Sequence, residues 1–292
     1  MILSGINKRG IQMEIRTKLK PFTKWTGGKR QLLDVLTANV PEEYETYYEP
    51  FIGGGALFFE LQPSNAVIND LNSDLVRTYE TIKNNVEELI DHLYIHDEHN
   101  AKEYYYDIRS MDRDGRYDEM SDAEKAARLM YMLRVNFNGL YRVNSKGQFN
   151  TPYGKYKNPK IVDEDLLYSI SHYLNNNNVS ILNKSFEEAL KTAKEGDFIY
   201  LDPPYVPLSA SSSFTAYTSE GFGYEEQVLL RDTFVELDKR GCYVMLSNSS
   251  AELVYDLYKD YSDTTIEVGA TRMINSNAKK RGVVKELLIK NY

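Results

Sequence analysis

Residues 46–70, TYYEPFIGGGALFFELQPSNAVIND, decide the expected fold. TYYEPF is typical of a buried strand, the glycines that follow it are typical of a turn, and LFFEL is typical of the start of a helix. NAVIND then has the pattern of a second strand. A strand, a turn, a helix and a strand in succession are the building unit of an α/β sheet. The sequence therefore predicts an α/β protein.

The same alternation returns after four consecutive asparagines, Asn175 to Asn178. The expected strands are 179–183, 197–201 and 242–247, and the expected helices are 185–196, 224–241 and 251–261. Two last strand-like runs, 264–270 and 283–292, indicate a closing hairpin. Ser185 and Glu188 have the spacing of a capping box at the start of the first of these helices.

The intervening segment, residues 71–174, has a different hydrophobic pattern. Helical patterns dominate it, as in 84–98 and in 121–135, and the latter opens with a capping box of Ser121 and Glu124. The polar stretch 136–160 is too long for a routine connection, which favours a functional loop. We therefore expect one α/β domain, residues 18–70 and 175–292, interrupted by a helical domain, residues 71–174. Residues 1–17 form an N-terminal extension for which disorder is one interpretation.

Charge is distributed unevenly along the chain. The 292 residues include 43 acidic and 35 basic side chains, and the resulting net charge of −8 argues on its face against a nucleic-acid partner. However, fifteen of the basic residues fall in three windows without any acid, 17–31, 140–160 and 268–285. If these windows converge, they form a basic cleft on an acidic body; if they lie on separate solvated loops, the clustering has no meaning for function. Charge alone leaves both interpretations open.

Cysteine content and hydropathy exclude other classes. A single cysteine, Cys242, can form neither a disulfide framework nor a Cys-based zinc site within the chain. No apolar run approaches the roughly 18 residues of a membrane span, and the first 20 residues lack the pattern of a secretory signal. We expect a soluble, cytoplasmic protein with no membrane partner.

The glycine loop Gly53–Gly55 follows the first expected strand. Glycines in this place let a ligand approach the backbone, and an acid about 20 residues further on commonly binds ribose hydroxyls, a part that Asp70 can play. The third glycine of the dinucleotide fingerprint is missing, because Phe58 occupies its place. A nucleoside without a pyrophosphate, such as S-adenosylmethionine, therefore fits at least as well as NAD or FAD. A tight turn with no ligand is the alternative.

In the stretch 198–209, FIYLDPPYVPLS, an acid, Asp202, directly follows an expected buried strand. Open α/β sheets bind ligands at this edge, so Asp202 is well placed to contact one. Pro203 and Pro204 have a fixed φ and no N–H, which stiffens the loop and leaves nearby carbonyls as acceptors. Two acceptors beside the ring of Tyr205 suit the amino group of a nucleobase, whose hydrogens they can hold. A proline-stiffened surface turn is the structural alternative.

In their order along the chain, PFTKWTGGKR, EPFIGGGALFF, the recognition segment and DPPY resemble the Dam-type, α-group DNA adenine-N6 methyltransferases. The resemblance is strongest to the GATC modification methyltransferases of Dpn restriction systems, and it extends from about Lys20 to Tyr292. It implies a Rossmann-like S-adenosylmethionine-dependent methyltransferase domain with an inserted, mainly helical target-recognition domain that carries a DNA-reading hairpin. It further implies transfer of a methyl group to N6 of an adenine flipped out of duplex GATC, without a metal, and a restriction endonuclease that acts separately.

The resemblance also assigns roles to residues of this chain. The catalytic set is Asp202, Pro203, Pro204 and Tyr205. The cofactor-binding set is Trp25, Lys29, Glu49, Phe51, Gly53, Gly55, Asp70 and Asp202. The DNA-binding set is Lys24, Phe137, Asn138, Leu140, Arg142, Pro152, Lys155, Tyr156 and Lys157. Within this set Arg142 matches a base-reading arginine, and Phe137 stands where relatives often carry a wedge tyrosine.

Two other features are weaker candidates. His92, His96 and His99 have helical spacing, but their acidic neighbours favour a solvated face over a metal site. Cys242 lies mid-strand among apolar residues, which favours a buried thiol over a nucleophile. Three alternative functions stay open: methylation of cytosine N4 or of an RNA adenine, a catalytically silent DNA-binding module, and a Rossmann oxidoreductase.

Overall fold

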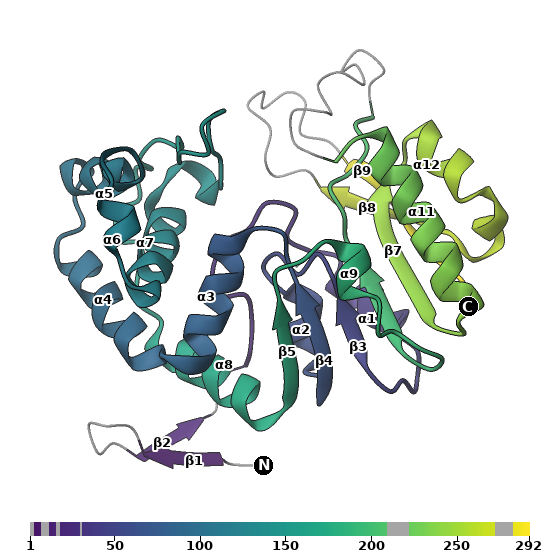
Figure 1. Ribbon diagram of the computed structural model, residues 1–292, viewed down its shortest axis with the longest axis horizontal. Helices are drawn as coiled ribbons and strands as arrows, with labels where there is room; N and C mark the ends of the chain where they lie inside the picture. The colour runs from purple at the N-terminus through teal and green to yellow at the C-terminus, as the bar shows by residue number, and fades with distance from the viewer. Residues whose placement is uncertain (1–2, 7–11, 16–17, 30, 209–221, 272–282) are drawn as a thin grey trace. The chain divides into compact units, whose positions relative to one another are not determined.

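The computed structural model describes residues 3–6, 12–15, 18–29, 31–208, 222–271 and 283–292 (Figure 1). The chain divides into two compact units. The first unit contains Met1–Gly28, Gly53–Ser64 and Asn72–Asn183, and the second contains Lys29–Ile52, Asn65–Leu71 and Lys184–Tyr292. The expected helical domain, 71–174, falls almost entirely in the first unit, which also includes the glycine loop and the segment that carries Trp25.

The sheet of seven strands has the order β5-β4-β3-β6-β7-β9-β8. The strands are β3 (Tyr47–Glu49), β4 (Asn65–Asn69), β5 (Asn178–Leu182), β6 (Phe198–Leu201), β7 (Tyr243–Ser249), β8 (Ile266–Thr271) and β9 (Val283–Lys290). β4, β3, β6 and β7 are parallel neighbours, whereas β9 is antiparallel to both β7 and β8. The predicted α/β fold and the predicted closing hairpin are therefore confirmed.

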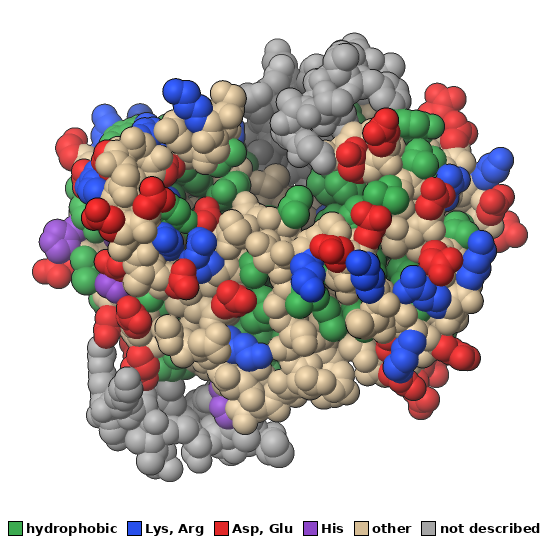
Figure 2. Space-filling model, viewed as in Figure 1, with side chains coloured by type: hydrophobic (Ala, Val, Ile, Leu, Met, Phe, Trp, Pro, Cys, Tyr) green, Lys and Arg blue, Asp and Glu red, His purple; other side chains and the backbone are tan. Residues whose placement is uncertain are grey.

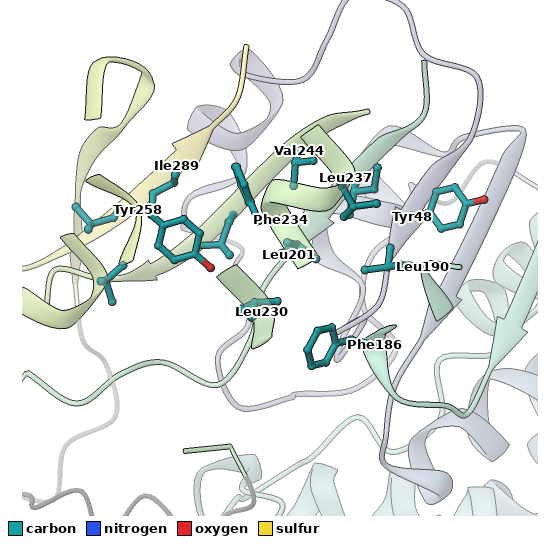
Figure 3. Close-up of a cluster of buried hydrophobic side chains, with 14 of the residues drawn as sticks. Tyr48, Phe186, Leu190, Leu201, Leu230, Phe234, Leu237, Val244, Tyr258 and Ile289 are labelled. Carbon is teal, nitrogen blue, oxygen red and sulfur yellow. The ribbon is translucent and has the colours of Figure 1, made fainter. Parts of the chain in front are cut away.

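One face of the sheet in the second unit carries a cluster of buried apolar side chains (Figure 3). Successive side chains of a strand point to opposite faces, and accordingly Val244 and Leu246 of β7 join this cluster while Met245 does not. Helix α11 (Tyr224–Lys239) covers the face with Leu230, Phe234 and Leu237, which recur at the spacing of one helical stripe.

The opposite face of the sheet is also covered. Helix α1 (Leu33–Ala38) buries Leu36, and this side chain lines a small space together with Leu288 of β9 and Ser247 of β7. Ser247 also forms a hydrogen bond of 3.0 Å with the hydroxyl of Tyr200 on β6. A sheet buried on both faces explains why the sequence of β6 is apolar throughout rather than alternating.

Two predicted helices of the second unit are shorter than expected. The helix expected at 185–196 is only α9 (Phe186–Ala189). Beyond it the Ala193 amide makes a tighter turn bond to the Leu190 carbonyl, the Lys194 amide donates to Oδ2 of Asp197, and the Arg240 guanidinium donates to the carbonyls of Leu190 and Ala193. The helix expected at 251–261 is α12 (Glu252–Leu257), followed by the 3-10 helix η2 (Lys259–Thr264).

The first unit is mainly helical. Its helices are α2 (Ala56–Leu61), α3 (Ser73–Asn84), α4 (Val86–Glu98), α5 (Lys102–Asp114), α6 (Arg116–Glu119), α7 (Asp122–Val135), the 3-10 helix η1 (Phe137–Gly139) and α8 (Glu164–Asn176). The predicted capping box of Ser121 and Glu124 is present at the start of α7. α7 is buried along most of its length, so it forms the centre of this unit.

Residues 1–17 include two described strands. β1 (Leu3–Ile6) and β2 (Gln12–Ile15) pair antiparallel, with Leu3 opposite Ile15 and Ile6 opposite Gln12. These two strands form a sheet of their own, separate from the sheet of seven strands.

Candidate active site

Polar side chains gather where the parallel strands of the second unit end. Glu49 is the last residue of β3, Asp70 follows β4, and Asp202 follows β6. Because β4, β3 and β6 are parallel neighbours, their carboxyl ends meet at one edge of the sheet. The structure therefore brings together three acids that the sequence predicted as site residues.

An ion pair occupies the centre of this edge. The Nζ of Lys29 lies 2.8 Å from Oδ1 of Asp202, and both side chains are largely withdrawn from solvent. Burial raises the pKa of the Asp202 carboxyl above its ordinary value, and the positive charge of Lys29 opposes part of that rise. Lys29 thus favours the ionised form of Asp202, which is the hydrogen-bond acceptor, whereas burial disfavours it.

Tyr205 lies against the same lysine. The Nζ of Lys29 is 4.6 Å from the centre of the Tyr205 ring, a cation–π contact. The Tyr205 hydroxyl donates a hydrogen bond of 2.8 Å to Oε2 of Glu286 on β9. Burial, followed by the negative charge of Asp202, raises the pKa of Tyr205 well above its ordinary value, so this residue stays a neutral phenol.

The proline loop is fixed from two neighbouring elements. The Nε2 of Gln227 on α11 donates to the Pro204 carbonyl at 3.0 Å, and Oδ1 of Asn248 on β7 accepts from the Val206 amide at 3.2 Å. Gln227 and Asn248 also bond to each other and are fully buried. Within the described part of the chain, no donor reaches the Pro203 carbonyl. The loop is therefore rigid and keeps an acceptor beside Asp202.

Sequence reasoning missed Gln227, Asn248 and Glu286. Each lies in a run whose pattern indicates only a helix or a strand, so nothing local marks it. Asn248 did carry one signal, because it is a polar residue near the carboxyl end of a buried parallel strand.

The remaining predicted residues of the second unit have structural neighbours of their own. The Glu49 carboxylate accepts a hydrogen bond of 2.7 Å from the Tyr47 hydroxyl, and both residues are buried. The Phe51 ring lies 5.4 Å from that of Phe186. Asn69, beside Asp70, donates to the Pro50 carbonyl at 2.9 Å, and this bond holds the chain that leads into the glycine loop.

The glycine loop itself belongs to the first unit. Gly53 and Gly55 have φ values of 47° and 68°, a region that residues with a Cβ rarely adopt. A Cβ on Gly53 would lie 2.9 Å from Cδ1 of Trp25, so the absent side chain also makes room for that indole. Tyr79, which the sequence did not mark, donates to the Gly53 carbonyl at 3.1 Å. The loop therefore requires glycine for two separate reasons.

The predicted DNA-reading segment is a hairpin in the first unit. Val143 pairs with Phe149 and Asn136 pairs with Tyr153, both antiparallel. Arg142 is exposed, and its Nε donates a hydrogen bond of 2.6 Å to Oδ1 of Asn150 on the facing strand. The hairpin thus presents the guanidinium in a defined orientation.

Other predicted DNA-binding residues surround this hairpin. Phe137 is 54% exposed although it is a large aromatic, and its amide bonds to the Pro152 carbonyl at 2.9 Å. The Nζ of Lys24 lies 5.1 Å from the centre of the Tyr156 ring, so two residues 132 positions apart in the chain are brought together. An exposed aromatic such as Phe137, and an aromatic ring beside a basic side chain such as Tyr156 beside Lys24, suit contact with nucleic acid.

The three acid-free windows are less purely basic in the structure than in the sequence. Lys18 pairs with Glu60, Lys20 and Lys160 pair with Asp163, and Lys285 pairs with Glu267. Figure 2 shows acidic and basic side chains interspersed over the visible face. Lys155 and Lys157 are exposed and form no ion pair within the described residues, which leaves them available for phosphates. Arg272, Lys279, Lys280 and Arg281 lie outside the described residues.

The structure corrects the interpretation of one histidine. His96 was expected on a solvated face, but it is buried, it stacks on Tyr131 with ring centres 4.8 Å apart, and its Nδ1 lies 2.8 Å from the Tyr104 hydroxyl. Burial lowers the pKa of His96 to about 4, so it is neutral at physiological pH. Across the described ranges, no group of three His, Cys, Asp or Glu side chains could hold a metal ion.

Cys242 is a buried thiol, as predicted. It is 2% exposed, its Sγ donates to the Lys194 carbonyl, and burial raises the pKa of the thiol to about 11. A thiol in this state is a poor nucleophile.

A buried acid and a proline loop at the carboxyl edge of its sheet place the protein in the class of α/β proteins that bind a ligand at this edge. Comparison with known proteins identifies the family. Residues 25–274 match the D12 class N6 adenine-specific DNA methyltransferases, and the chain belongs to this family. It is therefore an adenine-specific DNA methyltransferase, and membership implies DNA as the substrate and S-adenosylmethionine as the methyl donor.

Three curated relatives illustrate the similarity. The type II methyltransferase M1.LlaDCHI of Lactococcus lactis subsp. cremoris is 59% identical over 95% of this chain and 97% of its own length. The type II methyltransferase M.MjaIII of Methanocaldococcus jannaschii is 41% identical, over 94% and 100%. The DNA adenine methylase of Escherichia coli K12 is 33% identical, over 93% and 95%. In the ranges that the structure describes, no helix is long and apolar enough to cross a membrane.

Proposed function

We propose that this protein transfers a methyl group from S-adenosylmethionine to N6 of an adenine that is flipped out of duplex GATC. The observation that carries the proposal is the Asp202 carboxylate, which pairs with Lys29. It lies beside the Pro203 carbonyl, which accepts no hydrogen bond from any described residue. These two oxygens form a fixed pair of acceptors at the ligand-binding edge of the sheet.

The proposed catalysis consists of positioning and electrostatics. The adenine amino nitrogen is a poor nucleophile because its lone pair is delocalised into the ring. In the proposal, its hydrogens point at Oδ2 of Asp202 and at the Pro203 carbonyl, and Lys29 occupies Oδ1. The lone pair is then free to attack the methyl carbon, and the carboxylate stabilises the positive charge that develops on nitrogen. The extra proton leaves after the N–C bond has formed, so no strong base is required.

The residues expected at the cofactor suit a nucleoside ligand. The proposal keeps the eight residues that the resemblance assigns to the cofactor: Trp25, Lys29, Glu49, Phe51, Gly53, Gly55, Asp70 and Asp202. The positive φ of Gly53 and Gly55 fits this assignment, because a loop without Cβ atoms exposes its backbone to a ligand. Bound S-adenosylmethionine supplies the electrophilic methyl group.

Tyr205 is proposed as the platform for the extracted base. One face of its ring contacts Lys29, and its hydroxyl is anchored to Glu286, so the ring is held in place. Extraction of a base costs a few kcal/mol, and stacking on an aromatic ring returns roughly 1–3 kcal/mol. We assign the base to the face of the ring that Lys29 does not contact.

Recognition of GATC is proposed for the hairpin and its neighbours. Arg142 is the base-reading arginine, Lys24 and Tyr156 read the outer guanine, and Leu140 and Pro152 contact thymine methyl groups. Phe137 wedges between bases and Asn138 approaches the vacated thymine, while Lys155 and Lys157 bind phosphates. The exposure of Phe137 and the contact between Lys24 and Tyr156 support these roles. Since two relatives are named type II methyltransferases, we further propose a separate restriction endonuclease as partner, and cytoplasmic action on DNA.

A protection assay tests the proposed specificity. Plasmid incubated with the protein and S-adenosylmethionine is digested with a nuclease that cuts only unmethylated GATC, and resistance is the expected result. Mass analysis of the digested nucleosides should find N6-methyladenine. Full cleavage of a plasmid that has gained N6-methyladenine would contradict GATC as the target, whereas N4-methylcytosine would contradict the catalytic assignment.

A further inference from the structure

The second strand of the hairpin is an edge strand, and helix α5 completes it. The Gln148 carbonyl and the Asn150 amide bond to the first hairpin strand, at Asn144 and Arg142. In an antiparallel pair the intervening residue then points its N–H and C=O outward, and this residue is Phe149. Outward backbone groups of an edge strand require partners when they are buried.

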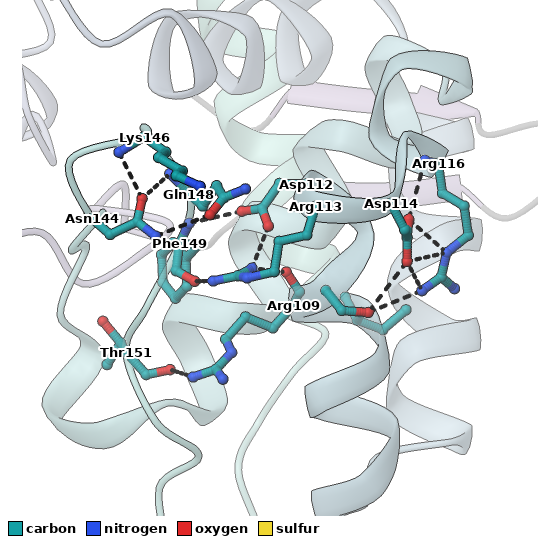
Figure 4. Close-up of polar contacts among 12 residues, drawn as sticks. Arg109, Asp112, Arg113, Asp114, Arg116, Asn144, Lys146, Gln148, Phe149 and Thr151 are labelled. Atoms are coloured by element: carbon teal, nitrogen blue, oxygen red, sulfur yellow. Dashed lines mark hydrogen bonds and ion pairs between the residues drawn. The ribbon is translucent and has the colours of Figure 1, made fainter.

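Two neighbouring residues of α5 supply these partners. The Phe149 amide donates to Oδ2 of Asp112 at 2.7 Å, and the Phe149 carbonyl accepts from Nη2 of Arg113 at 2.5 Å (Figure 4). One turn or two earlier on the same helix face, Arg109 and Tyr105 both donate to the Thr151 carbonyl. Side chains of α5 therefore take the place of a third strand along residues 149–151.

Asp112 is the centre of this arrangement. Its carboxylate pairs with Arg113 and also with Arg128 of α7, whose Nη2 lies 3.3 Å from Oδ2. The Arg128 side chain is only 5% exposed, and its Nε also donates to the Ile108 carbonyl of α5. Asp112 thus connects the hairpin backbone to a buried cation at the centre of the unit.

Apolar packing supports the hairpin only in part. A cavity of about 380 Å³ lies in this region, lined among others by Asp112, Arg128, Val143, Lys146 and Phe149. The Phe149 ring is buried, 5.7 Å from that of Tyr141. Where the hairpin borders open space apolar contacts cannot hold it, so along this border the polar contacts from α5 add to the fixing of its position. Between the two fixed residues, Phe149 and Thr151, stands Asn150, which orients Arg142.

We infer that Asp112 is a positioning residue for sequence recognition: through the backbone of residues 149–151 and through Asn150 it sets the place of the Arg142 guanidinium. This inference rests on the proposed role of Arg142 in base reading. It assigns to Asp112, Arg113 and Arg128 a part in specificity although none of them contacts a base in the proposal.

Asp112→Asn tests the inference, with Asp114→Asn as the matched control. The first change keeps the shape of the side chain but removes the charge that faces Arg113 and Arg128. The second removes an acid from the same helix whose ion-pair partner, among the residues that the structure describes, is Arg116 alone. Hydrogen exchange of the Phe149 amide in the free protein measures the hairpin, and kcat/KM on the best duplex divided by kcat/KM on duplexes with one changed base pair measures discrimination.

In Asp112→Asn we expect faster exchange at Phe149, a roughly tenfold loss of discrimination, and an unchanged KM for S-adenosylmethionine. Asp114→Asn should match the wild type in all three. Faster exchange with intact discrimination would overturn the inference, and so would unchanged exchange. The best duplex is determined by sequencing methylated DNA, so a preference other than GATC contradicts the proposed function and still tests the role of Asp112. A wild-type protein that methylates adenine without any sequence preference would contradict both the role of Asp112 and the proposed function.

Discussion

The Nζ of Lys29 lies 2.8 Å from Oδ1 of Asp202 in a place that is largely closed to water. This pair joins the segment before the first helix of the second unit to the loop after β6, and it fixes a carboxylate at the edge of the sheet. The same lysine lies over the Tyr205 ring, so one cation orients two residues of the proposed catalytic set.

Asp202→Asn should abolish most methyl transfer. The amide keeps the size of the side chain, but it loses the charge that stabilises a developing positive nitrogen. We expect kcat to fall by roughly 100- to 1000-fold, the range for removal of one preorganised electrostatic contact. Transfer of labelled methyl groups to duplex DNA measures it, and Asp256→Asn, an exposed change on α12, is the control. An Asp202→Asn protein that folds and methylates at wild-type rate would refute the catalytic assignment.

The pH profile should reflect the raised pKa of Asp202. Because the carboxylate is the required form, kcat falls as the pH drops through a value above about 3.9, the ordinary aspartate pKa. Lys29→Met removes the opposing positive charge, so the acidic limb should move to higher pH when the cofactor is saturating. A limb that stays in place would show that Lys29 does not control this carboxyl.

Stability should respond to the same titration. A carboxyl whose pKa is raised in the folded state binds its proton more tightly there than in the unfolded chain. Its contribution to stability is therefore complete below the unfolded pKa and is lost as the pH rises through the folded pKa. Thermal unfolding of wild type and Asp202→Asn across this range should show the wild type losing stability relative to the variant as the pH increases.

Gly53→Ala should weaken cofactor binding. The new Cβ would lie 2.9 Å from Cδ1 of Trp25, and the φ of 47° is unfavourable for alanine. Gly115→Ala is the matched control, since its φ of 87° carries similar strain while nothing lies within 4 Å. Calorimetric titration with S-adenosylmethionine should show reduced affinity only for Gly53→Ala. Equal affinities of the two variants for S-adenosylmethionine would show that this loop does not contact the cofactor.

Arg142→Ala should relax sequence choice more than it weakens binding. A bidentate arginine discriminates its guanine by roughly 1–3 kcal/mol, so activity on GATC should approach that on duplexes with one altered base pair. Competition between cognate and altered duplexes measures the change. A uniform loss on all sequences would mean that Arg142 contacts a phosphate.

Lys155→Ala and Lys157→Ala should flatten the salt dependence of DNA binding. Each lost phosphate contact lowers the slope of log affinity against log salt by about 0.9. Lys18→Ala, which removes a lysine already paired with Glu60, is the control and should leave the slope unchanged. Slopes equal to wild type in both hairpin variants would exclude these lysines from the interface.

The sequence by itself determined the fold class and the position of the chemistry. Strand patterns around the glycine loop and around FIYLDPPY predicted an α/β sheet with Asp202 at its edge. The reason is that a buried parallel strand is apolar throughout, and polar residues follow only where the strand ends. The order of four short motifs indicated the family to which the chain belongs. These features are local, so they are visible along the chain.

Only the tertiary structure decided which distant residues share an environment. It paired Lys29 with Asp202, placed Gln227 and Asn248 behind the proline loop, and buried His96 where its acidic neighbours suggested exposure. It also placed Asp112 and Arg128 behind the hairpin, 37 and 21 residues before Phe149 in the chain. The cause is physical: the partner of a buried charge or a backbone group is set by packing between elements, and no periodicity of a single element encodes it.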